Sequence, residues 1–374
     1  MQTALGKPRF SPKSLPFSAF SKFLTAAILL AFARSSPVLG AAPKGASTKP
    51  SDAEQAAMTN LGKELKALIV WSTSRVSGNH DLFIMNADGT GERALTKNDN
   101  VDWYPRFSPD GKQVLFCRSK SGWASEGKTD HNEMWDTFVI NTDGTGEKKL
   151  VSDALWGTWI DGGKILYSRN DKIYTMDLTS GEEKVLCDSK DGLPGAVLQQ
   201  PELSPDGKYL AMTLRGRRRE TGILNLEKKE WTKTGEGCEV NWFPSADRIF
   251  WVNPSGNGGS EIFAAAVKDG KLADPGIKYD KLKWVDLPGK QSHEYFCKLS
   301  QDGKWLVWCA TIFGHEHDIY DYDVFCWKVG APIEQAVRLT FHTGNDRWPD
   351  IFVMQEPAKA DESSKKEAEK GVGQ

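Results

Sequence analysis

The sequence predicts an all-β protein, a six-bladed β-propeller built from four-stranded antiparallel blades. Three observations predict this fold, and the first two concern the repeats. One turn motif recurs along the chain, and each copy is followed by short segments rich in β-branched and aromatic residues, which favour strands. A third observation concerns the two ends of the repetitive region, which are incomplete in complementary ways. We therefore expect the N- and C-terminal strands to share one blade and to close the ring.

The recurring turn is written SPDGK at 108–112 and 204–208, and variants stand at 161–164, 244–248 and 300–304. The last residues of successive copies are 52, 44, 40 and 56 positions apart. Asp, Gly and Pro suit tight turns, because Pro presets one dihedral angle and Gly and Asp tolerate the unusual ones. The segments that follow, QVLF, ILY, YLAM, IFW and WLVW, have the composition of strands. Each copy indicates a hairpin that forms the inner half of a blade.

A third strand is expected after each hairpin, and a fourth often follows, as in ERALT, KKLV, KVLC and VRLT. Four strands in roughly 45 residues are typical of propeller blades. The third strands begin near residues 81, 136, 172, 220, 261 and 322. They number six, whereas only five hairpins are complete.

The two chain ends account for the missing hairpin. The C-terminal segment DRWPDIF, 346–352, is similar to the first strand DWYPRF, 102–107. The segment 62–75 is similar to the second strand of a hairpin and has no first strand before it. The C-terminal strand should complete the blade that begins at the N-terminus.

The remaining segments differ from the repeats in composition. Basic residues precede the apolar run FLTAAILLAFA at 23–33, and Val38 and Gly40 supply small residues before a cleavage point. We predict a signal peptide at 1–40 and a periplasmic or secreted location, with a buried N-terminal helix as the alternative. Further domain predictions are a linker at 41–62, for which a short terminal helix is left open, the propeller at 63–354, and a disordered charged tail at 355–374.

Bulk composition excludes some classes of partner. The chain has 374 residues, 26% of them charged, and a formal net charge of −2. This balance gives no reason to expect nucleic acid as a partner, and after signal cleavage we expect a monomer without stable membrane insertion. The six cysteines match no zinc pattern, so core packing is expected. Cys309 and Cys326 should lie on neighbouring strands, where a disulfide is the alternative.

The segments DLFIMNADGTGERALT, from residue 81, and DWYPRFSPDGKQVLF, from residue 102, resemble the repeat of the TolB-type β-propeller family. The resemblance covers about 66–353, and it implies the propeller fold and export. TolB itself has an α/β domain before its propeller. The predicted mature chain reaches its first blade strand within about 25 residues, so we expect a TolB-like protein that lacks that N-terminal domain. The Tol–Pal role does not follow, because propellers with different functions share this fold.

Candidate binding residues gather on one face of the predicted disc. Loops from the second to the third strand of a blade, and from one blade to the next, leave this face and carry all six histidines. On a rigid propeller such loops usually carry function. The predicted ligand-binding residues are His293, Glu294, His315, His317, His342, Asp346, Arg347 and Asp102.

A divalent metal is the one cofactor that these residues suggest. Imidazole and carboxylate groups are suitable ligands, and the predicted metal ligands are His293, His315 and His317. No strict ligand spacing is met. The alternative is that the histidines are polar loop residues or only hydrogen-bond a ligand. The arginine-rich loop RGRRR, 215–219, could bind carboxylate or phosphate groups, or could be a solvated charged loop.

Motifs for catalysis are not found in the sequence. No serine elbow is followed by an ordered Asp and His, and nothing selects a catalytic pair among the acidic residues. The predicted function is therefore an exported TolB-like module of the cell envelope that binds an envelope protein or an oligosaccharide. The alternative is a metal-dependent carbohydrate-active enzyme. Oligogalacturonate lyases resemble this family in using TolB-type repeats and a His-coordinated metal, and His315, His317 and the loop at 217–219 would suit an acidic sugar.

Overall fold

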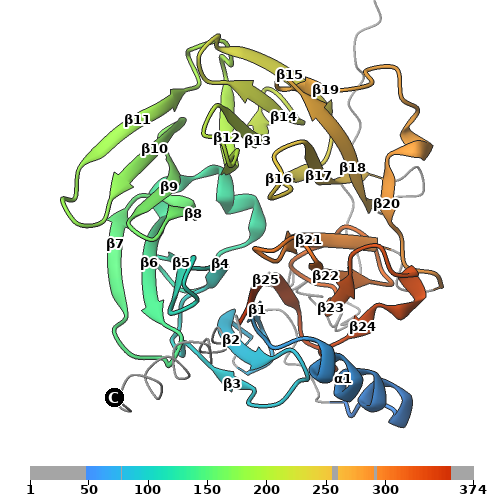
Figure 1. Ribbon diagram of the computed structural model, residues 1–374. Helices are drawn as coiled ribbons and strands as arrows, with labels where there is room; N and C mark the ends of the chain where they lie inside the picture. The colour runs from blue at the N-terminus through green and yellow to red at the C-terminus, as the bar shows by residue number, and fades with distance from the viewer. Residues whose placement is uncertain (1–47, 77, 255–259, 290–292, 355–374) are drawn as a thin grey trace, which may run out of the picture. The chain divides into compact units, whose positions relative to one another are not determined.

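The computed structural model describes residues 48–76, 78–254, 260–289 and 293–354, which all fall within one compact unit of the chain. The predicted signal peptide and the charged tail lie outside the described residues. Six antiparallel sheets surround a central axis and form the six blades of a propeller (Figure 1). The predicted fold class is confirmed.

For each blade, the strands are given in order from the central axis outward. Blade 1 consists of β25 (Asp346–Val353), β1 (Ala67–Thr73), β2 (Asp81–Asn86) and β3 (Arg93–Ala94). Blade 2 consists of β4 (Asp102–Phe107), β5 (Gln113–Ser119), β6 (Trp135–Asn141) and β7 (Lys148–Ser152). Blade 3 consists of β8 (Leu155–Asp161), β9 (Lys164–Arg169), β10 (Lys172–Asp177) and β11 (Glu183–Asp188).

Blades 4 to 6 follow the same order, and blade 5 carries one additional strand, β20, which pairs with β18. Blade 4 consists of β12 (Ala196–Leu203), β13 (Tyr209–Gly216), β14 (Glu220–Asn225) and β15 (Glu230–Gly235). Blade 5 consists of β16 (Cys238–Trp242), β17 (Arg248–Pro254), β18 (Ser260–Lys268), β19 (Lys271–Leu272) and β20 (Lys283–Val285). Blade 6 consists of β21 (His293–Leu299), β22 (Trp305–Thr311), β23 (Asp323–Lys328) and β24 (Val337–Arg338). Short 3-10 helices lie in the connections: η1 (Glu126–Asp130), η2 (Asn132–Met134), η3 (Tyr279–Lys281) and η4 (Ile333–Gln335).

The ring closes between the two ends of the repetitive region, as the sequence predicts. β25 from the C-terminal part pairs with β1 from the N-terminal part, with Ala67 opposite Val353 and Thr73 opposite Asp346. This pairing satisfies backbone groups of β1 that would otherwise form an open sheet edge. Blade 1 is therefore built from both ends of the ring.

Every innermost strand contains the same irregularity. One residue in each has a positive φ, between 50° and 61°, and the register with the next strand shifts at that point. A positive φ is strained for residues other than glycine, and a β-bulge re-aims the side chain. The six residues are Tyr104, Trp156, Gln200, Glu239, Phe296 and Trp348.

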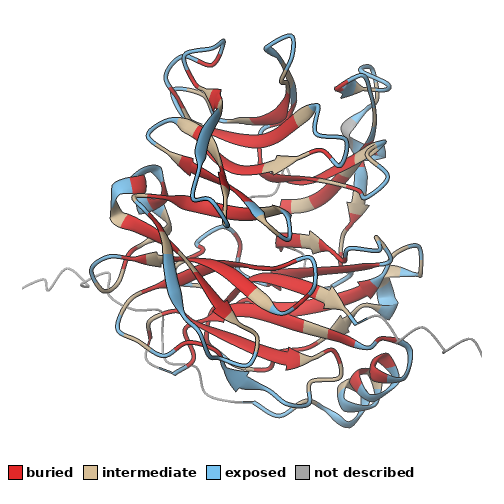
Figure 2. Cartoon of the chain, turned by 60° about the vertical axis from the view of Figure 1, so that its left-hand side comes forward, coloured by how far each residue is buried: buried red, intermediate tan, exposed pale blue. Residues whose placement is uncertain are grey.

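Buried residues follow the strands, and exposed residues occupy the loops and outer edges (Figure 2). The largest hydrophobic cluster includes Trp71, Trp308 and Phe325, which are almost fully buried. Burial of apolar surface between neighbouring sheets is the main stabilising contribution in such a fold.

The described residues include one α-helix, α1 (Asp52–Glu64), which begins in the segment predicted as a linker at 41–62 and extends two residues beyond it. Ser51 begins it with a capping box, in which the side chains of Ser51 and Glu54 bond reciprocally to backbone groups. Met58 and Leu61 are buried in the largest hydrophobic cluster, so the helix packs against the propeller. Among the described residues, no helix is long and apolar enough to cross a membrane.

All six cysteines of the chain are described, and all are buried free thiols. Cys309 and Cys326 do lie on neighbouring strands, β22 and β23. However, Cys309 is opposite Val324, and Cys326 is opposite Val307. The disulfide alternative is therefore wrong: the register places the two residues diagonally, and core packing is confirmed.

Candidate functional site

Aromatic side chains fill the middle of the central channel. The ring centroids of Tyr104 and Trp156 are 4.9 Å apart, and Trp348 lies 5.4 Å from each of them. Phe296 lies 4.3 Å from Trp348. These four residues, which we call the aromatic plug, come from the bulges of blades 2, 3, 6 and 1. Rings from blades that are not neighbours can meet only at the axis, so the channel is not an open pore.

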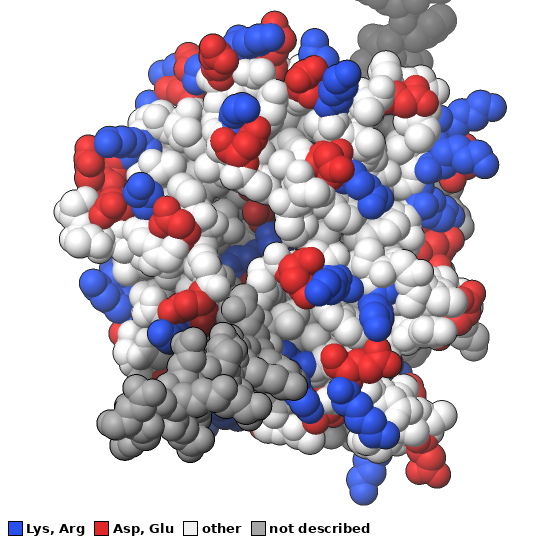
Figure 3. Space-filling view, in the orientation of Figure 1, with Lys and Arg blue, Asp and Glu red and all other residues white. Residues whose placement is uncertain are grey.

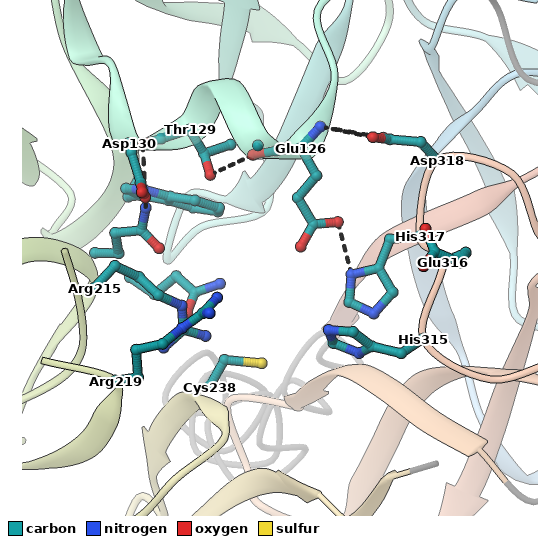
Figure 4. A pocket seen from close by; sticks show the side chains of 14 residues that line it. Glu126, Thr129, Asp130, Arg215, Arg219, Cys238, His315, Glu316, His317 and Asp318 are labelled. Atoms are coloured by element: carbon teal, nitrogen blue, oxygen red, sulfur yellow. Dashed lines mark hydrogen bonds and ion pairs between the residues drawn. The ribbon is translucent and has the colours of Figure 1, made fainter. Parts of the chain in front are cut away.

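A cavity of about 290 Å³ lies on one side of the aromatic plug. Trp156, Gln200 and Cys238 belong to its lining and come from innermost strands. The remaining lining comes mainly from three loops that connect second to third strands, in blades 2, 4 and 6 (Figure 4). This is the face on which the sequence predicts function.

One wall of the cavity combines a carboxylate with histidines. Glu126, in the long loop between β5 and β6, accepts a hydrogen bond of 2.6 Å from Nδ1 of His317. Arg347 donates to the same carboxylate oxygen at 3.0 Å. Burial alone would raise the pKa of Glu126, but attraction to His317 and Arg347 outweighs it and lowers the pKa from 4.5 to about 2. Glu126 is therefore ionised at neutral pH.

Asp318 fixes the loop that carries Glu126. Its carboxylate accepts from the backbone N–H of Glu126 at 3.0 and 3.1 Å, and Arg347 donates to it at 3.4 Å. Arg347 is fully buried, and its guanidinium stacks 4.4 Å from the ring centroid of Trp103. At the other end of the loop, Gln199 donates to Asp130 at 2.7 Å. The loop is thus tied to blades 6 and 4 across the channel mouth.

The two histidines of blade 6 lie side by side, with ring centroids 4.5 Å apart. Nδ1 of His315 lies 3.1 Å from the hydroxyl of Tyr295. Burial, together with the neighbouring His317, lowers the pKa of His315, which favours the neutral imidazole. Nε2 of His317 is buried and has no hydrogen-bond partner among the described residues.

The opposite wall is basic. Arg215 and Arg219 project toward the cavity from the side that faces Glu126 and His315, with Cys238 between the two walls (Figure 4). The two arginines thus lie on one side of the cavity, where Asp130 is also found, and the histidines lie on the other. On the outer face shown in Figure 3, by contrast, acidic and basic side chains stand next to each other over the blades, without a large patch of one sign.

The structure brings three of the eight predicted binding residues together. His315 and His317 line the cavity, and Arg347 bonds to Glu126 in its wall. The other five do not line it: His293, Glu294, His342, Asp346 and Asp102.

Those five residues have contacts elsewhere in the fold. Asp346 pairs with Arg75, and Asp102 is buried and accepts from Arg118 at 2.7 and 2.9 Å. Glu294 accepts from the backbone N–H of Leu287, and burial raises its pKa to about 9. These contacts are typical of structural residues.

His293 and His342 lie outside the cavity wall. His293 begins β21, opposite Thr311. Burial lowers the pKa of His342, which is also close enough to Arg75 to be repelled by its charge.

The predicted metal site does not form a cluster of ligands. Within the described part of the chain, no group of three or more His, Cys, Asp or Glu residues is arranged to hold a metal ion. His315 and His317 supply two imidazoles, and one nitrogen of each already faces a partner. The donor set therefore does not fit a three-ligand metal centre, and the metal stays a prediction.

Sequence reasoning missed Glu126 as a site residue, and it did not choose between Arg215 and its neighbours. The signal for Glu126 was the unusual length of the connection between β5 and β6, because the other blades have shorter ones. Nothing in the sequence indicates which carboxylate of that loop turns inward.

Comparisons with known proteins agree on the fold. No family model matches the chain. Dipeptidyl-peptidase 5 of Porphyromonas endodontalis is 24% identical over 263 residues, which are 65% of this chain and 34% of that protein. The Tol-Pal system protein TolB of Rhizorhabdus wittichii is 33% identical over 89 residues, 22% of this chain and 18% of TolB. The chain thus matches about a third of the first relative's length and less of the second.

Solved structures include TolB-like propellers. A protein of Agrobacterium tumefaciens with the provisional name TolB is 15% identical, with a TM-score of 0.50, over 78% of this chain and 99% of that one. An oligogalacturonate lyase in complex with manganese is 9% identical, with a TM-score of 0.43, over 69% of this chain and 74% of that one. At 15% identity, the likeness to the Agrobacterium protein shows the fold alone. The chain is similar to TolB-like propellers in its architecture.

Proposed function

We propose that the protein is an exported, TolB-like propeller that acts as a binding module of the cell envelope, for an envelope protein or an oligosaccharide. Its binding site is the cavity at the mouth of the channel on the histidine-bearing face. Export is inferred from the leader at 1–40.

One observation carries this proposal: the channel is closed by the aromatic plug and hollowed on one side, where two arginines face Glu126 and two histidines across the cavity. A concave site with a few convergent polar groups is the usual form of a ligand site. The opposite face has a smaller cavity, of about 190 Å³, near the axis. There Lys298 already bonds to Glu202 and to Asn241, so fewer polar groups are left for a ligand.

A bulky substitution at the cavity wall tests the proposal. Gly127 lines the cavity, and a Cβ atom there would meet only the Ser125 hydroxyl, at 3.9 Å. Gly127→Trp should therefore place a large side chain at the cavity wall without displacing the backbone. Gly162 is the matched control, because it lies in a turn on the opposite face and a Cβ atom there meets nothing within 4 Å.

The measurement is binding of a panel of purified envelope oligosaccharides and envelope proteins by calorimetry, together with cell fractionation. We expect a partner whose binding is lost in Gly127→Trp and kept in Gly162→Trp. Equal binding by both variants would place the binding surface away from the cavity, and an unexported chain would remove the envelope role.

A second candidate is the metal-dependent carbohydrate-active enzyme, and the observation in its favour is that His315 and His317 share the cavity with Arg215 and Arg219. Two imidazoles are one ligand short of a three-ligand metal centre, so the metal content of the protein decides whether this candidate holds. Mass spectrometry of the protein purified without chelators separates the two candidates. Near-stoichiometric metal that disappears in His315→Ala/His317→Ala, together with metal-dependent release of unsaturated products from acidic oligosaccharides, would favour the enzyme.

A further inference from the structure

Two arginines on the cavity wall have no carboxylate partner among the described residues. Arg215 donates to the backbone carbonyls of Leu214 and Gly237, at 3.1 and 3.2 Å, and Arg219 makes no ion pair there. Their neighbour Arg218 differs, because it pairs with Glu220 at 2.5 Å. A guanidinium held at one edge keeps its other N–H groups for a planar, two-oxygen acceptor. The basic wall can therefore receive a carboxylate.

The facing wall offers acceptors. Nδ1 of His317 donates to the carboxylate of Glu126, so Nε2 is the ring nitrogen left for a ligand, and in the neutral form of the ring it is an acceptor. That nitrogen is buried, has no partner among the described residues, and belongs to a side chain that is only 5% exposed. A buried polar atom without a partner destabilises the fold unless a ligand or water satisfies it. A hydroxyl or ammonium group on a ligand would do so.

We propose that the cavity binds a compact ligand with a carboxylate at one end, recognised by Arg215 and Arg219, and a hydroxyl or ammonium donor at the other, recognised by Nε2 of His317 and by Glu126. This inference rests on the proposed function and names the chemistry of its ligand. A volume of about 290 Å³ is at the lower end for ligand sites, so the bound group has the size of a monosaccharide or dipeptide. The carboxylate of Glu126 would repel a second negative charge at the donor end of the ligand.

Matched probes isolate each end of the ligand. Dialanine carries both a carboxylate and an ammonium group, its amide lacks the carboxylate, and N-acetyldialanine lacks the ammonium group. Glucuronate and glucose form a second pair, which differs in the carboxylate. Calorimetry gives the affinities, and the NMR signals of the His315 and His317 rings report whether the probe occupies the cavity.

We expect at least one carboxylate probe to bind and its uncharged counterpart to bind about tenfold more weakly or worse, as for other charge-assisted hydrogen bonds. Binding of dialanine alone would identify a peptide-like ligand, and binding of glucuronate alone would identify a sugar acid. In the peptide series, acetylation should also weaken binding, because it removes the positive charge of the ammonium group that faces Glu126.

Variants in one loop provide the matched control. Arg219→Ala and Arg215→Ala should weaken carboxylate binding about tenfold or more. Arg217→Ala should not, because Arg217 does not line the cavity and its side chain lies over Gly195. Arg219→Glu is the second variant in case Arg215→Ala fails to fold, and it should abolish binding.

Two results would overturn the inference: no saturable binding by any carboxylate probe, or equal affinity for an acid and its neutral counterpart. In the second case, shifts of the histidine signals by the neutral probe would still support the cavity as the binding site. The failure of the ligand chemistry is thereby separated from the failure of the proposed function.

Discussion

Glu126 and His317 are 191 residues apart in the chain and are joined by a hydrogen bond of 2.6 Å between Oε2 and Nδ1. The bond connects the long loop of blade 2 to the loop of blade 6 across the mouth of the channel. Arg347 reaches the same carboxylate oxygen from blade 1. Three blades therefore meet at one carboxylate. Protonation of this carboxylate at low pH should weaken the contacts between them.

Glu126→Gln should remove an acid-dependent part of the stability. The pKa of Glu126 is lowered from 4.5 to about 2 in the folded protein, so its contribution is fully present above about pH 4.5 and is lost as the pH falls toward 2. Urea unfolding between pH 2 and 6 should show a steeper loss of stability in the wild type than in Glu126→Gln. Glu133→Gln is the control, because that exposed residue of the same loop pairs with the exposed His131. Parallel pH profiles for the wild type and Glu126→Gln would contradict the ion pair.

Glu239 should have the opposite pH dependence. Burial raises its pKa from 4.5 to about 8, so the folded protein keeps a proton that the unfolded chain releases. The free energy of unfolding should therefore decrease as the pH rises from about 4.5 to 8. Glu239→Gln should flatten this decrease, since an amide oxygen can still accept from the backbone N–H of Cys297. The measurement is urea unfolding between pH 5 and 8, and an unchanged slope in the variant would show that Glu239 is ionised.

Trp348→Ala should destabilise the propeller by about 3–5 kcal/mol, the usual cost of truncating a buried aromatic residue. Trp348 touches the other three members of the aromatic plug, so its removal leaves a void that no neighbour fills. Phe313→Ala serves for comparison, because Phe313 is 54% exposed. Urea unfolding at neutral pH measures both. A loss below about 1 kcal/mol for Trp348→Ala would mean that the plug is not tightly packed.

Truncation after Asn345 should abolish cooperative unfolding, because it removes β25 and leaves β1 as an open edge. Truncation after Met354 keeps all of β25 and should leave the melting temperature unchanged. Thermal unfolding and light scattering distinguish the two chains. A cooperative, monomeric transition in the shorter chain would show that ring closure is dispensable.

The sequence by itself determined the architecture. Turn residues and strand composition are local properties, and five similar turns with six third strands imply a closed ring of blades. The similarity of 346–352 to 102–107 was enough to predict the pairing of β25 with β1. The sequence also identified the face that carries His315 and His317, because the length and polarity of loops can be read along the chain.

The tertiary structure decided which residues meet. Glu126 and the two arginines of the basic wall come from different blades, and their distances depend on how six sheets pack around one axis. The bulge of each innermost strand turns Tyr104, Trp156 and Trp348 into the channel, although nothing in their local sequence marks a positive φ. His293 begins β21, in the same blade as His315, but it does not line the cavity. Repeat patterns depend on local interactions, whereas a site at the axis depends on long-range packing, and a single sequence specifies that packing only through the complete fold.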